Sequence, residues 1–412
     1  MGDASAGRLF AEGVAFHKQG RLAQAAQAYA AACEADPSHV GARFNLAVAL
    51  HSQGLDGEAE RAYRQALAVK PDLVQALNNL GNLLLAHERV AEALEALMRA
   101  TALAPGFAPP WNNLGNALLR MGRTPEAAAR FARALEIDAG FNEARGNLGR
   151  ALLTLGRPAE ALAHLEQALA ASPGDETLRF ARDVAAGARP PRPPDAFVAG
   201  LFDGMAAKFD EHLVDGLGYR IPGRIADVLG AWLDERPRPR RVLDLGCGTG
   251  LVADALRGRF ESMRGADLSP RMVERALARR LYASVEAIGL EPFLRATPDA
   301  SADLVVAADV FVYLGDLAPV FAEAARVLAA GGRFAFSVEG GGAGEGYTLE
   351  PTSRYSHPDA YVRTLAAAAG LTVAHRSTEV IRAERGVPAP GALYVLEKGG
   401  RAPPPGPAPQ AR

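Results

Sequence analysis

Small and bulky apolar residues recur every 34 positions through the first half of the chain. A small residue is followed by a bulky one four places later, and by an alanine three places after that. The three series are Ala25, Ala59, Ala93, Ala127 and Ala161; Tyr29, Tyr63, Leu97, Phe131 and Leu165; and Ala32, Ala66, Ala100, Ala134 and Ala168. This spacing lets two antiparallel helices pack closely, so each period predicts one helical pair.

Turn-forming residues follow the same period. Glycine stands at the predicted inner turn in four of the five periods, and Glu88 occupies the remaining slot. Proline marks the end of four periods, at Pro37, Pro71, Pro105 and Pro173. We therefore predict five repeats over 6–39, 40–73, 74–107, 108–141 and 142–175, with a capping helix over 176–187. The pattern resembles tetratricopeptide repeats, which stack into an all-α superhelix.

A row of asparagines occupies the sixth place of successive repeats, at Asn45, Asn79, Asn113 and Asn147. An amide carries both donors and an acceptor, so a column of them can bind the backbone of an extended peptide. The row resembles the asparagine ladder in the repeats of O-linked N-acetylglucosamine transferase. This resemblance implies a peptide groove and a protein or peptide partner. The alternative is that these amides serve hydrogen bonds inside the repeats.

The pattern changes after the proline-rich segment 188–195, which we expect to be an extended linker. Residues 196–398 alternate between apolar strands and helical segments, which predicts a doubly wound, mostly parallel sheet. Only nine residues, 382–390, separate the last two strands, too few for a parallel crossover, so we expect an antiparallel last strand. The seven predicted strands cover 240–245, 262–267, 283–288, 302–308, 332–339, 371–381 and 391–398.

Composition narrows the classes of function. The formal net charge is −2, which argues against nucleic acid and anionic membranes as partners. Two distant cysteines, Cys33 and Cys247, predict neither a disulfide framework nor a metal site. No signal peptide or membrane-spanning run is evident, so we expect a cytoplasmic protein. Residues 399–412 are rich in proline and glycine, which predicts a disordered tail.

The stretch VLDLGCGTG, residues 242–250, contains the clearest chemical signal. Gly246, Gly248 and Gly250 allow a tight turn that brings the backbone close to a ligand. The spacing differs from the dinucleotide fingerprint, and Asp244 would repel a diphosphate but suits a cationic group. Asp267 ends the next predicted strand, where a carboxylate can bind both ribose hydroxyls. S-adenosylmethionine, an adenosine with an amino-acid tail and no phosphate, meets these demands.

The same residues resemble motifs I and II of Rossmann-like, class I S-adenosylmethionine-dependent methyltransferases. The second motif is GADLSPRMVERA, residues 265–276. The resemblance implies that the loop Gly246–Gly250, which includes Cys247, binds the methionine part. It also implies that Asp267 binds the ribose and that Leu268 and Met272 flank the adenine.

The domain 196–398 is further similar to a bacterial group of predicted methyltransferases fused to tetratricopeptide repeats, and to a vertebrate methyltransferase-like protein of the Williams–Beuren region. In that group the segment around Phe202, Asp203, Phe209 and Asp210 forms helices that cap the cofactor. Members often carry an acid near Gly289, which is absent here. Adenine recognition then falls to the backbone of residues 288–290 or to Glu291.

The methyl acceptor is expected over the carboxyl ends of the fourth and fifth strands. Our candidates for catalysis are Asp309, Tyr313 and His357, and Asp309 also faces the cofactor tail in this interpretation. Further candidates near this end are Glu339, Arg354 and Tyr355. The sequence AADVFVY lacks both the signature of amino methylation in DNA and the cysteine of cytosine C5 methylation. The acceptor is therefore expected to be a protein or a small molecule.

Two other functions remain open at this point. The repeats can act as a scaffold, with a cofactor domain that is regulatory or catalytically weak. An NAD-dependent dehydrogenase has a similar sheet, but the glycine spacing and Asp244 argue against it. The leading hypothesis is an active methyltransferase whose repeats recruit the acceptor or its carrier.

Overall fold

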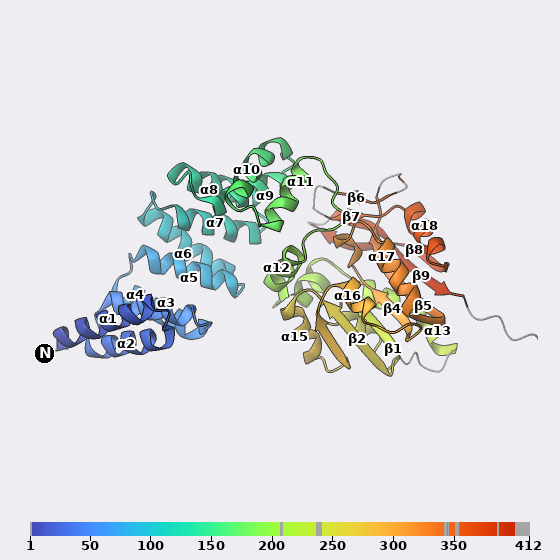
Figure 1. Ribbon diagram of the computed structural model, residues 1–412, viewed down its shortest axis with the longest axis horizontal. Coiled ribbons are helices and arrows are strands. Elements are labelled where there is room, and N and C mark those ends of the chain that lie inside the picture. The colour runs from blue at the N-terminus through green and yellow to red at the C-terminus, as the bar shows by residue number, and fades with distance from the viewer. Residues whose placement is uncertain are drawn as a thin grey trace, which may run out of the picture. The chain divides into compact units, whose positions relative to one another are not determined.

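The computed structural model describes residues 2–206, 209–235, 241–341, 344, 346–350, 354–384 and 387–399. The chain divides into two compact units, Met1–Ala185 and Ala186–Arg412 (Figure 1). Residues 400–412 of the predicted disordered tail lie outside the described residues. Within the described ranges, no helix combines the length and the apolar character needed to cross a membrane.

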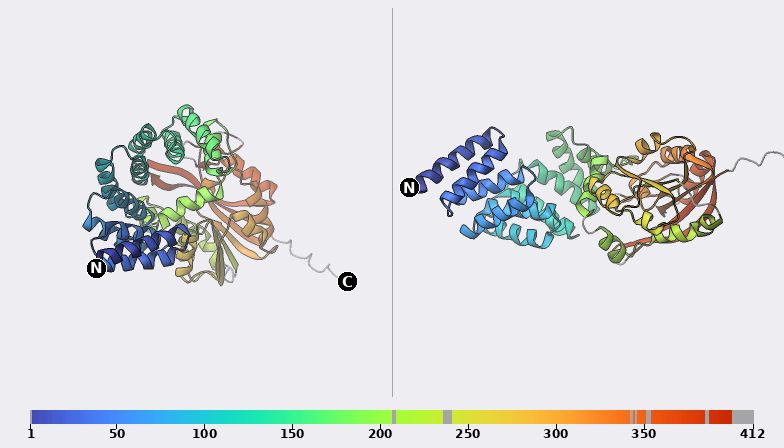
Figure 2. Two further views of the ribbon diagram at one scale, coloured as in Figure 1. Left: turned by 60° about the vertical axis from the view of Figure 1, so that its left-hand side comes forward. Right: turned by 90° about the horizontal axis from the view of Figure 1, so that it is seen from below.

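The first unit is built from helical pairs that follow the 34-residue period. Successive pairs stack on one another, and their contacts run from each second helix to the first helix of the next pair (Figure 2). This confirms the predicted all-α repeat architecture. The helices are α1 (Gly2–Lys18), α2 (Leu22–Ala35), α3 (Val40–His51), α4 (Asp56–Val69), α5 (Val74–Ala86), α6 (Val90–Leu103), α7 (Ala108–Arg120), α8 (Thr124–Ile137), α9 (Asn142–Thr154), α10 (Pro158–Ala171) and α11 (Glu176–Ala185).

Backbone conformation at the inner turns explains the period of glycines. Gly20, Gly54, Gly122 and Gly156 all adopt a left-handed conformation, with φ between 71° and 74°. Glu88 occupies the equivalent place and is also left-handed, with φ of 58°. A left-handed conformation costs energy for Glu88 that glycine would avoid. The turn between the two helices therefore imposes this conformation even on a residue that disfavours it.

Close packing inside each pair depends on a second column of small residues. Gly115 on α7 lies against Phe131 on α8, and Gly81 on α5 lies against Leu97 on α6. Gly13 and Gly149 contact the corresponding bulky residues of their own repeats. The bulky residues are buried in a core that runs through the stacked repeats. In these pairs a glycine on the first helix makes room for the bulky residue on the second helix, so the two helices pack closely.

The second unit contains the predicted parallel sheet. Strands β3, β2, β1, β4 and β5 are adjacent and parallel in this order. β9 then pairs antiparallel with β5, and β8 pairs antiparallel with β9, as the short connection predicts. The bounds are β1 (Arg241–Leu245), β2 (Ser262–Asp267), β3 (Ser284–Ala287), β4 (Ala302–Ala307), β5 (Leu328–Glu339), β8 (Leu371–Glu384) and β9 (Val387–Lys398). Two short strands that the sequence did not reveal, β6 (Thr348–Leu349) and β7 (Tyr355–Ser356), continue from β5.

Helices cover both faces of this sheet and bury two separate apolar layers. One layer contains residues of α13, such as Ile225 and Leu229, and the other contains Phe321 of α17 and Val362 of α18. The helices are α12 (Asp195–Met205), the π-helix η2 (Glu211–Gly216), α13 (Ile221–Glu235), α14 (Leu251–Ala255), α15 (Pro270–Ala278), α16 (Leu290–Arg295), the 3₁₀ helix η3 (Phe311–Tyr313), α17 (Ala318–Val327) and α18 (Asp359–Ala368).

The proline-rich segment that we expected to be a linker is fastened to the second unit. The carbonyl of Pro191 accepts hydrogen bonds from the N–H groups of Gly315, at 2.7 Å, and Asp316, at 3.2 Å. The Tyr355 hydroxyl donates to the Pro190 carbonyl at 2.8 Å. Prolines keep this segment extended, and its carbonyls supply the contacts. We call residues 189–194 the strap; it leads directly into α12.

Replacing Gly115 with alanine is expected to lower the free energy of unfolding by about 1–3 kcal/mol. A Cβ at this position would lie 2.4 Å from Cε1 of the buried Phe131 ring, so the two helices must separate. The measurement is urea unfolding of the full chain, followed by helical circular dichroism. Gly7→Ala in α1 is the control, because no atom lies within 4 Å of its Cβ. The Gly7 variant should gain ~0.5–1 kcal/mol in free energy of unfolding, because alanine favours the helix more than glycine does. Equal changes in the two variants would contradict the packing argument.

Candidate active site

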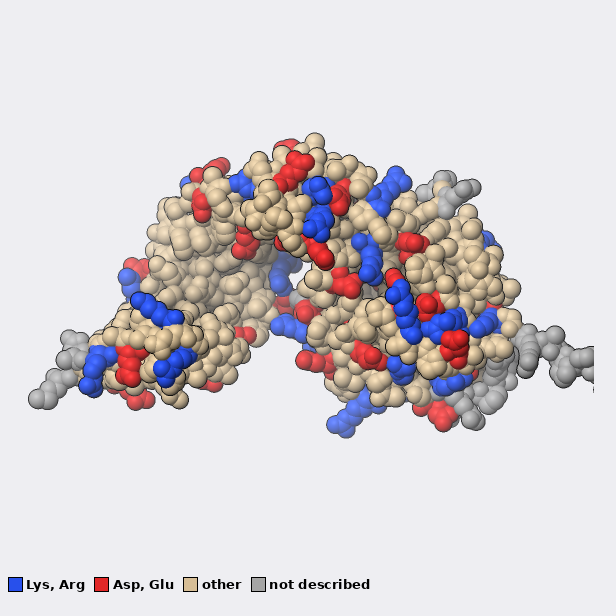
Figure 3. Space-filling model, in the orientation of Figure 1, with Lys and Arg blue, Asp and Glu red and all other residues tan. Residues whose placement is uncertain are grey.

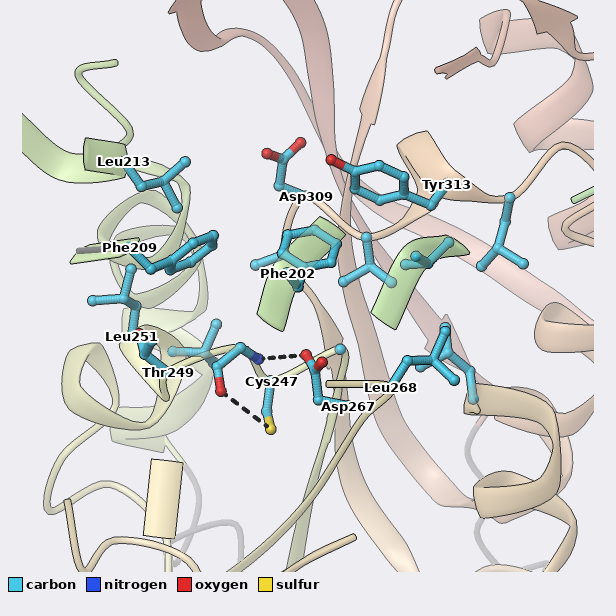
Figure 4. A pocket seen from close by; sticks show the side chains of 18 of the residues that line it. Phe202, Phe209, Leu213, Cys247, Thr249, Leu251, Asp267, Leu268, Asp309 and Tyr313 are labelled. Atoms are coloured by element: carbon cyan, nitrogen blue, oxygen red, sulfur yellow. Dashed lines mark hydrogen bonds between the residues drawn. The ribbon is translucent and has the colours of Figure 1, made fainter. Parts of the chain in front are cut away.

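A cavity opens in the second unit at the carboxyl ends of the parallel strands. Its wall combines the glycine loop after β1, Asp267 and Leu268 after β2, residues 289–291 after β3, and the segment after β4. Residues of α12 and η2 close it from the other side. In Figure 4, Asp309 and Tyr313 lie at one end, and Asp267 and Leu268 lie at the other. The topology therefore gathers the predicted motifs around one cavity.

The glycine loop has the backbone conformation that its composition predicts. Gly246, Gly248 and Gly250 have positive φ angles of 62°, 53° and 93°. A Cβ on Gly246 would lie 2.5 Å from Cγ2 of Val310, so only glycine allows this approach. Gly246 and Gly248 line the cavity, whereas Gly250 lies behind it, at the start of α14. Cys247 also lines the cavity; burial raises the pKa of its thiol, so the sulfur stays protonated and unreactive.

Asp267 is held in the cavity wall by the backbone. Its Oδ2 accepts from the Gly248 N–H and its Oδ1 from the Ser269 N–H, both at 2.9 Å. Burial raises the pKa of Asp267, and these backbone donors act in the opposite direction. Each carboxylate oxygen has a second lone pair, so Asp267 can still accept hydrogen bonds from a ligand.

Asp244 lies beneath the glycine loop and does not line the cavity. Its Oδ2 accepts from the Tyr282 hydroxyl at 2.6 Å, whereas its buried Oδ1 has no hydrogen-bond partner among the described residues. Burial raises the pKa of Asp244 to about 7, although the Tyr282 hydroxyl lowers it. A buried, half-satisfied acid is costly and responds strongly to positive charge placed nearby.

The two residues expected to flank adenine differ in position. Leu268 lines the cavity. Met272 is completely buried inside α15, and its N–H donates to the Ser269 hydroxyl, which caps this helix. Met272 therefore supports the loop after β2 from behind and does not line the cavity.

Aromatic residues of the cap segment reach into the cavity. Phe202 of α12 packs edge-on against Tyr313, with ring centroids 5.2 Å apart, and against Phe209, 6.0 Å apart. Two acids fasten this segment to the rest of the wall: Asp203 bonds Ser269, and Asp210 bonds Thr249. The segment expected to cap the site by resemblance therefore covers the cavity.

At the opposite end, Asp309 occupies a strained position after β4. Its backbone is left-handed, with φ of 58°, and its N–H donates to the Ser337 hydroxyl at 2.8 Å. Its carboxylate pairs with Arg382 at 2.7 Å, and the same guanidinium also pairs with Glu339. Burial raises the pKa of Asp309 to about 6, although Arg382 and Arg354 lower it.

Arg382 is a site residue that no sequence motif indicated. It lines the cavity from β8, and only 2% of its surface is exposed. The pairing of β8 with β9 shifts register between Val380 and Arg382, so the neighbours Ile381 and Arg382 are both buried. A bulge of this kind redirects a side chain. Arg382 lies one residue beyond the predicted strand 371–381, in a segment with several other charged residues, so no sequence pattern singled it out.

Tyr313 lines the cavity beside Asp309, and burial raises the pKa of its hydroxyl. Tyr219, which precedes α13, is a second buried tyrosine in the wall, and no motif indicated it. Arg354 also lines this end. Together they surround Asp309 with polar groups in an otherwise apolar cavity.

His357 does not line the cavity. Its Nε2–H donates to the carbonyls of Leu314, at 2.8 Å, and Gly315, at 3.1 Å, and its ring stacks on Tyr361. Burial lowers the pKa of His357 to about 4, so the ring is neutral near pH 7. Its contacts are those of a side chain that supports the loop after β4, and we leave it out of the proposed acceptor site.

The asparagine row of the first unit takes part in a chain of amide hydrogen bonds between repeats. Asn113 donates to Asn78 at 2.9 Å, and Asn147 donates to Asn112 at the same distance. Asn79 donates a long hydrogen bond to the Tyr63 hydroxyl at 3.4 Å. Asn45 forms the equivalent hydrogen bond with the Tyr29 hydroxyl one repeat earlier. Neighbouring amides thus use part of the hydrogen-bonding capacity of the row internally.

Replacing Arg382 with methionine is expected to lower the free energy of unfolding by about 3–5 kcal/mol. The change leaves Asp309 and Glu339 buried without their shared positive charge. Arg363→Met is the control, since Arg363 is 51% exposed and its ion pair with Asp359 is solvated. We expect a loss of at most about 1 kcal/mol there. Scanning calorimetry of the full chain compares the two, and equal losses would refute a buried ion pair.

Curated relatives match up to about a third of the chain. Malonyl-[acyl-carrier protein] O-methyltransferase of Hahella chejuensis is 34% identical over 140 residues, which cover 33% of this chain and 47% of that protein. The Geobacter sulfurreducens enzyme of the same name is 38% identical over 153 residues, 35% of this chain and 54% of that protein. Methyltransferase-like protein 27 of Homo sapiens is 37% identical over 109 residues, which cover 26% of this chain and 43% of that protein. The matches span about half the length of these relatives.

Among solved structures, a thermophilic TPR protein of Thermus thermophilus aligns with a TM-score of 0.37 and 25% identity over 44% of this chain and 98% of that chain. The family model described as methyltransferase domain matches residues 243–336. Tetratricopeptide repeat models match residues 13–54, 42–70, 57–106 and 112–176. The chain therefore combines tetratricopeptide repeats with a methyltransferase domain.

Proposed function

We propose that the second unit is an S-adenosylmethionine-dependent methyltransferase. The observation that carries this proposal is the buried Asp244, whose Oδ1 lacks a partner among the described residues, directly beneath the glycine loop. A sulfonium ligand with an amino-acid tail supplies positive charge to such a site, and a diphosphate does not. In this proposal Asp267 binds the ribose hydroxyls, and Leu268 and Gly289 flank the adenine.

The residues present fit this cofactor in a second way. The glycine loop leaves room in the cavity wall at Gly248, where the nearest atom to an added Cβ would be Cε1 of Phe209, at 3.7 Å. The glycine loop therefore offers main chain, without bulky side chains, to the ligand. Close approach of backbone to a ligand is the reason such loops consist of glycine.

When bound, S-adenosylmethionine supplies an electrophilic methyl group on a sulfonium. Asp309, which a pKa of about 6 keeps largely ionised near pH 7, is proposed to take the proton of the acceptor. Arg382 holds the Asp309 carboxylate in place through their 2.7 Å ion pair. Phe202, Phe209 and Leu213 exclude water from the cavity, since all three line it from the cap segment.

We infer that the acceptor atom is an oxygen of a protein-bound or small-molecule substrate. Four of the curated relatives carry O-methyltransferase in their names. A general base beside the acceptor suits a hydroxyl, which is a weak nucleophile while it keeps its proton. On the face shown in Figure 3, acidic and basic side chains are interspersed, which argues against a nucleic-acid backbone as substrate.

We further propose that the repeat unit recruits a protein or peptide that carries or supplies the acceptor. Asn45, Asn79 and Asn113 are half-buried, and the bonds within the row occupy only part of the capacity of their amides. Asn147 is buried and bonds Asn112, Asn116 and Arg150, so we leave it out of the proposed peptide surface. A repeat array presents such groups along an extended surface.

Replacing Asp267 with asparagine is expected to weaken the binding of S-adenosylhomocysteine at least about tenfold in calorimetry. The amide offers one acceptor oxygen where the carboxylate offers two, and it carries no charge. Asp303→Asn is the matched control, because Asp303 lies at the other end of the sheet, where it bonds the N–H of Arg241. Equal affinity of the wild type and the Asp267 variant would refute the cofactor site.

Turnover is tested with radiolabelled S-adenosylmethionine and a lysate of the source organism. Label in a protein band or a small-molecule fraction, lost with Asp267→Asn, supports the enzyme and identifies the acceptor class. If replacing Asn79 and Asn113 with alanine then removes label while cofactor affinity is unchanged, the repeats recruit the acceptor. Cofactor binding without any label would favour a scaffold with a regulatory cofactor domain.

The rate with that acceptor should depend on the ionisation of Asp309. Because the carboxylate is the active form, kcat/KM should rise as pH increases through about 6 and level off above it. Asp309→Asn should lower kcat about 10²–10⁴-fold and abolish this acidic limb. A pH profile that keeps the limb in the variant would rule out Asp309 as the base.

A further inference from the structure

One end of the cavity contains an acid that no motif includes. Asp195, the first residue of α12, lines the cavity, and its Oδ2 lies 3.7 Å from the position that a Cβ on Gly289 would occupy. Leu268 borders the same point, at 3.8 Å. Among the described residues, no hydrogen bond or ion pair uses the Asp195 carboxylate. An unengaged acceptor therefore lies where the loops after β2 and β3 meet.

We propose that Asp195 selects adenine by accepting a hydrogen bond from its exocyclic amino group; this rests on the proposed cofactor site. The amino group is a donor, and in an apolar wall it needs an acceptor to offset its lost hydration. A carboxylate accepts only, so it pairs with an amino group and rejects the carbonyl of a hypoxanthine base.

The other acid at this end is already engaged. Glu291 pairs with Arg295 at 2.9 Å, and Arg192 of the strap lies 3.6 Å from its other oxygen. The N–H of Ile288 is likewise in use, because it donates to the Asp267 carbonyl at 2.9 Å. Glu291 therefore has partners for both carboxylate oxygens, whereas Asp195 has none among the described residues.

The strap determines where Asp195 lies. Hydrogen bonds to the carbonyls of Pro190 and Pro191 fix its course, and Pro193 is buried in the cavity wall. Pro194 then precedes α12 with φ of −58° and ψ of 141°. Asp195 is thus held by rigid, bonded backbone, although it lies far in sequence from the loop that it faces.

The test measures the affinities of the full chain for S-adenosylhomocysteine and S-inosylhomocysteine by calorimetry. The second ligand replaces the amino group with a carbonyl. The wild type should prefer the adenosyl ligand at least about tenfold. Asp195→Ala should lower this preference to about threefold or less. Asp195→Asn should do the same and improve inosyl binding, because an amide can donate to the carbonyl.

A rescue variant separates a role in selectivity from a role in folding. Gly289→Asp in the Asp195→Ala background should restore the adenosyl preference. Gly289 has an ordinary φ of −68°, and the nearest atom to an added Cβ would be Cδ of Pro292, at 3.6 Å, which is an ordinary contact. Glu291→Gln is the matched control and should keep the wild-type preference.

Two outcomes would overturn this inference. One is that Asp195→Ala weakens the binding of both ligands equally, which would mean that Asp195 only maintains the shape of the cap. The other is that Glu291→Gln, and not the Asp195 variants, loses the preference. If the wild type binds neither ligand, the proposed cofactor site itself fails, and the result is distinguishable from a loss of selectivity.

Discussion

The close approach of the glycine loop to its neighbours is the constraint on which the candidate site depends. Gly246 lies so near Val310 that no side chain fits between them, and the Gly248 N–H bonds Asp267 at 2.9 Å. The backbone after β1 is thereby locked to the strand ends on both sides of it. The same arrangement buries Asp244 with an oxygen that no described residue pairs, at a cost of about 1–3 kcal/mol that a positively charged ligand can offset.

The cavity is closed by chain that precedes the sheet. The strap and α12 come before β1 in sequence, yet they supply Phe202 and Asp195 to the wall. Asp203 and Asp210 fasten this cap to the loops after β2 and β1. Because these bonds join elements distant in sequence, the position of the cap depends on the loops of the assembled sheet.

The opposite end of the cavity is organised by a buried charge cluster. Arg382 reaches Asp309 across 73 positions of sequence because a bulge in β8 turns its side chain inward. Burial raises the pKa of Asp309 to about 6, and the negative charge of Glu339 acts in the same direction, against Arg382 and Arg354. The left-handed backbone of Asp309 adds strain that the bond to Ser337 holds in place.

Local spacing and backbone preference were enough to predict the repeat period, the mostly parallel sheet with its antiparallel last strand, and the glycine loop. The sequence also indicated Asp267, Asp309 and Tyr313, since residues at the ends of parallel strands meet at one edge. The position of His357 outside the cavity, and of Arg382 and Asp195 within its wall, became evident only from the folded chain. A bulge and a bonded strap direct these last two, and such features arise from pairing between distant segments that no local pattern records.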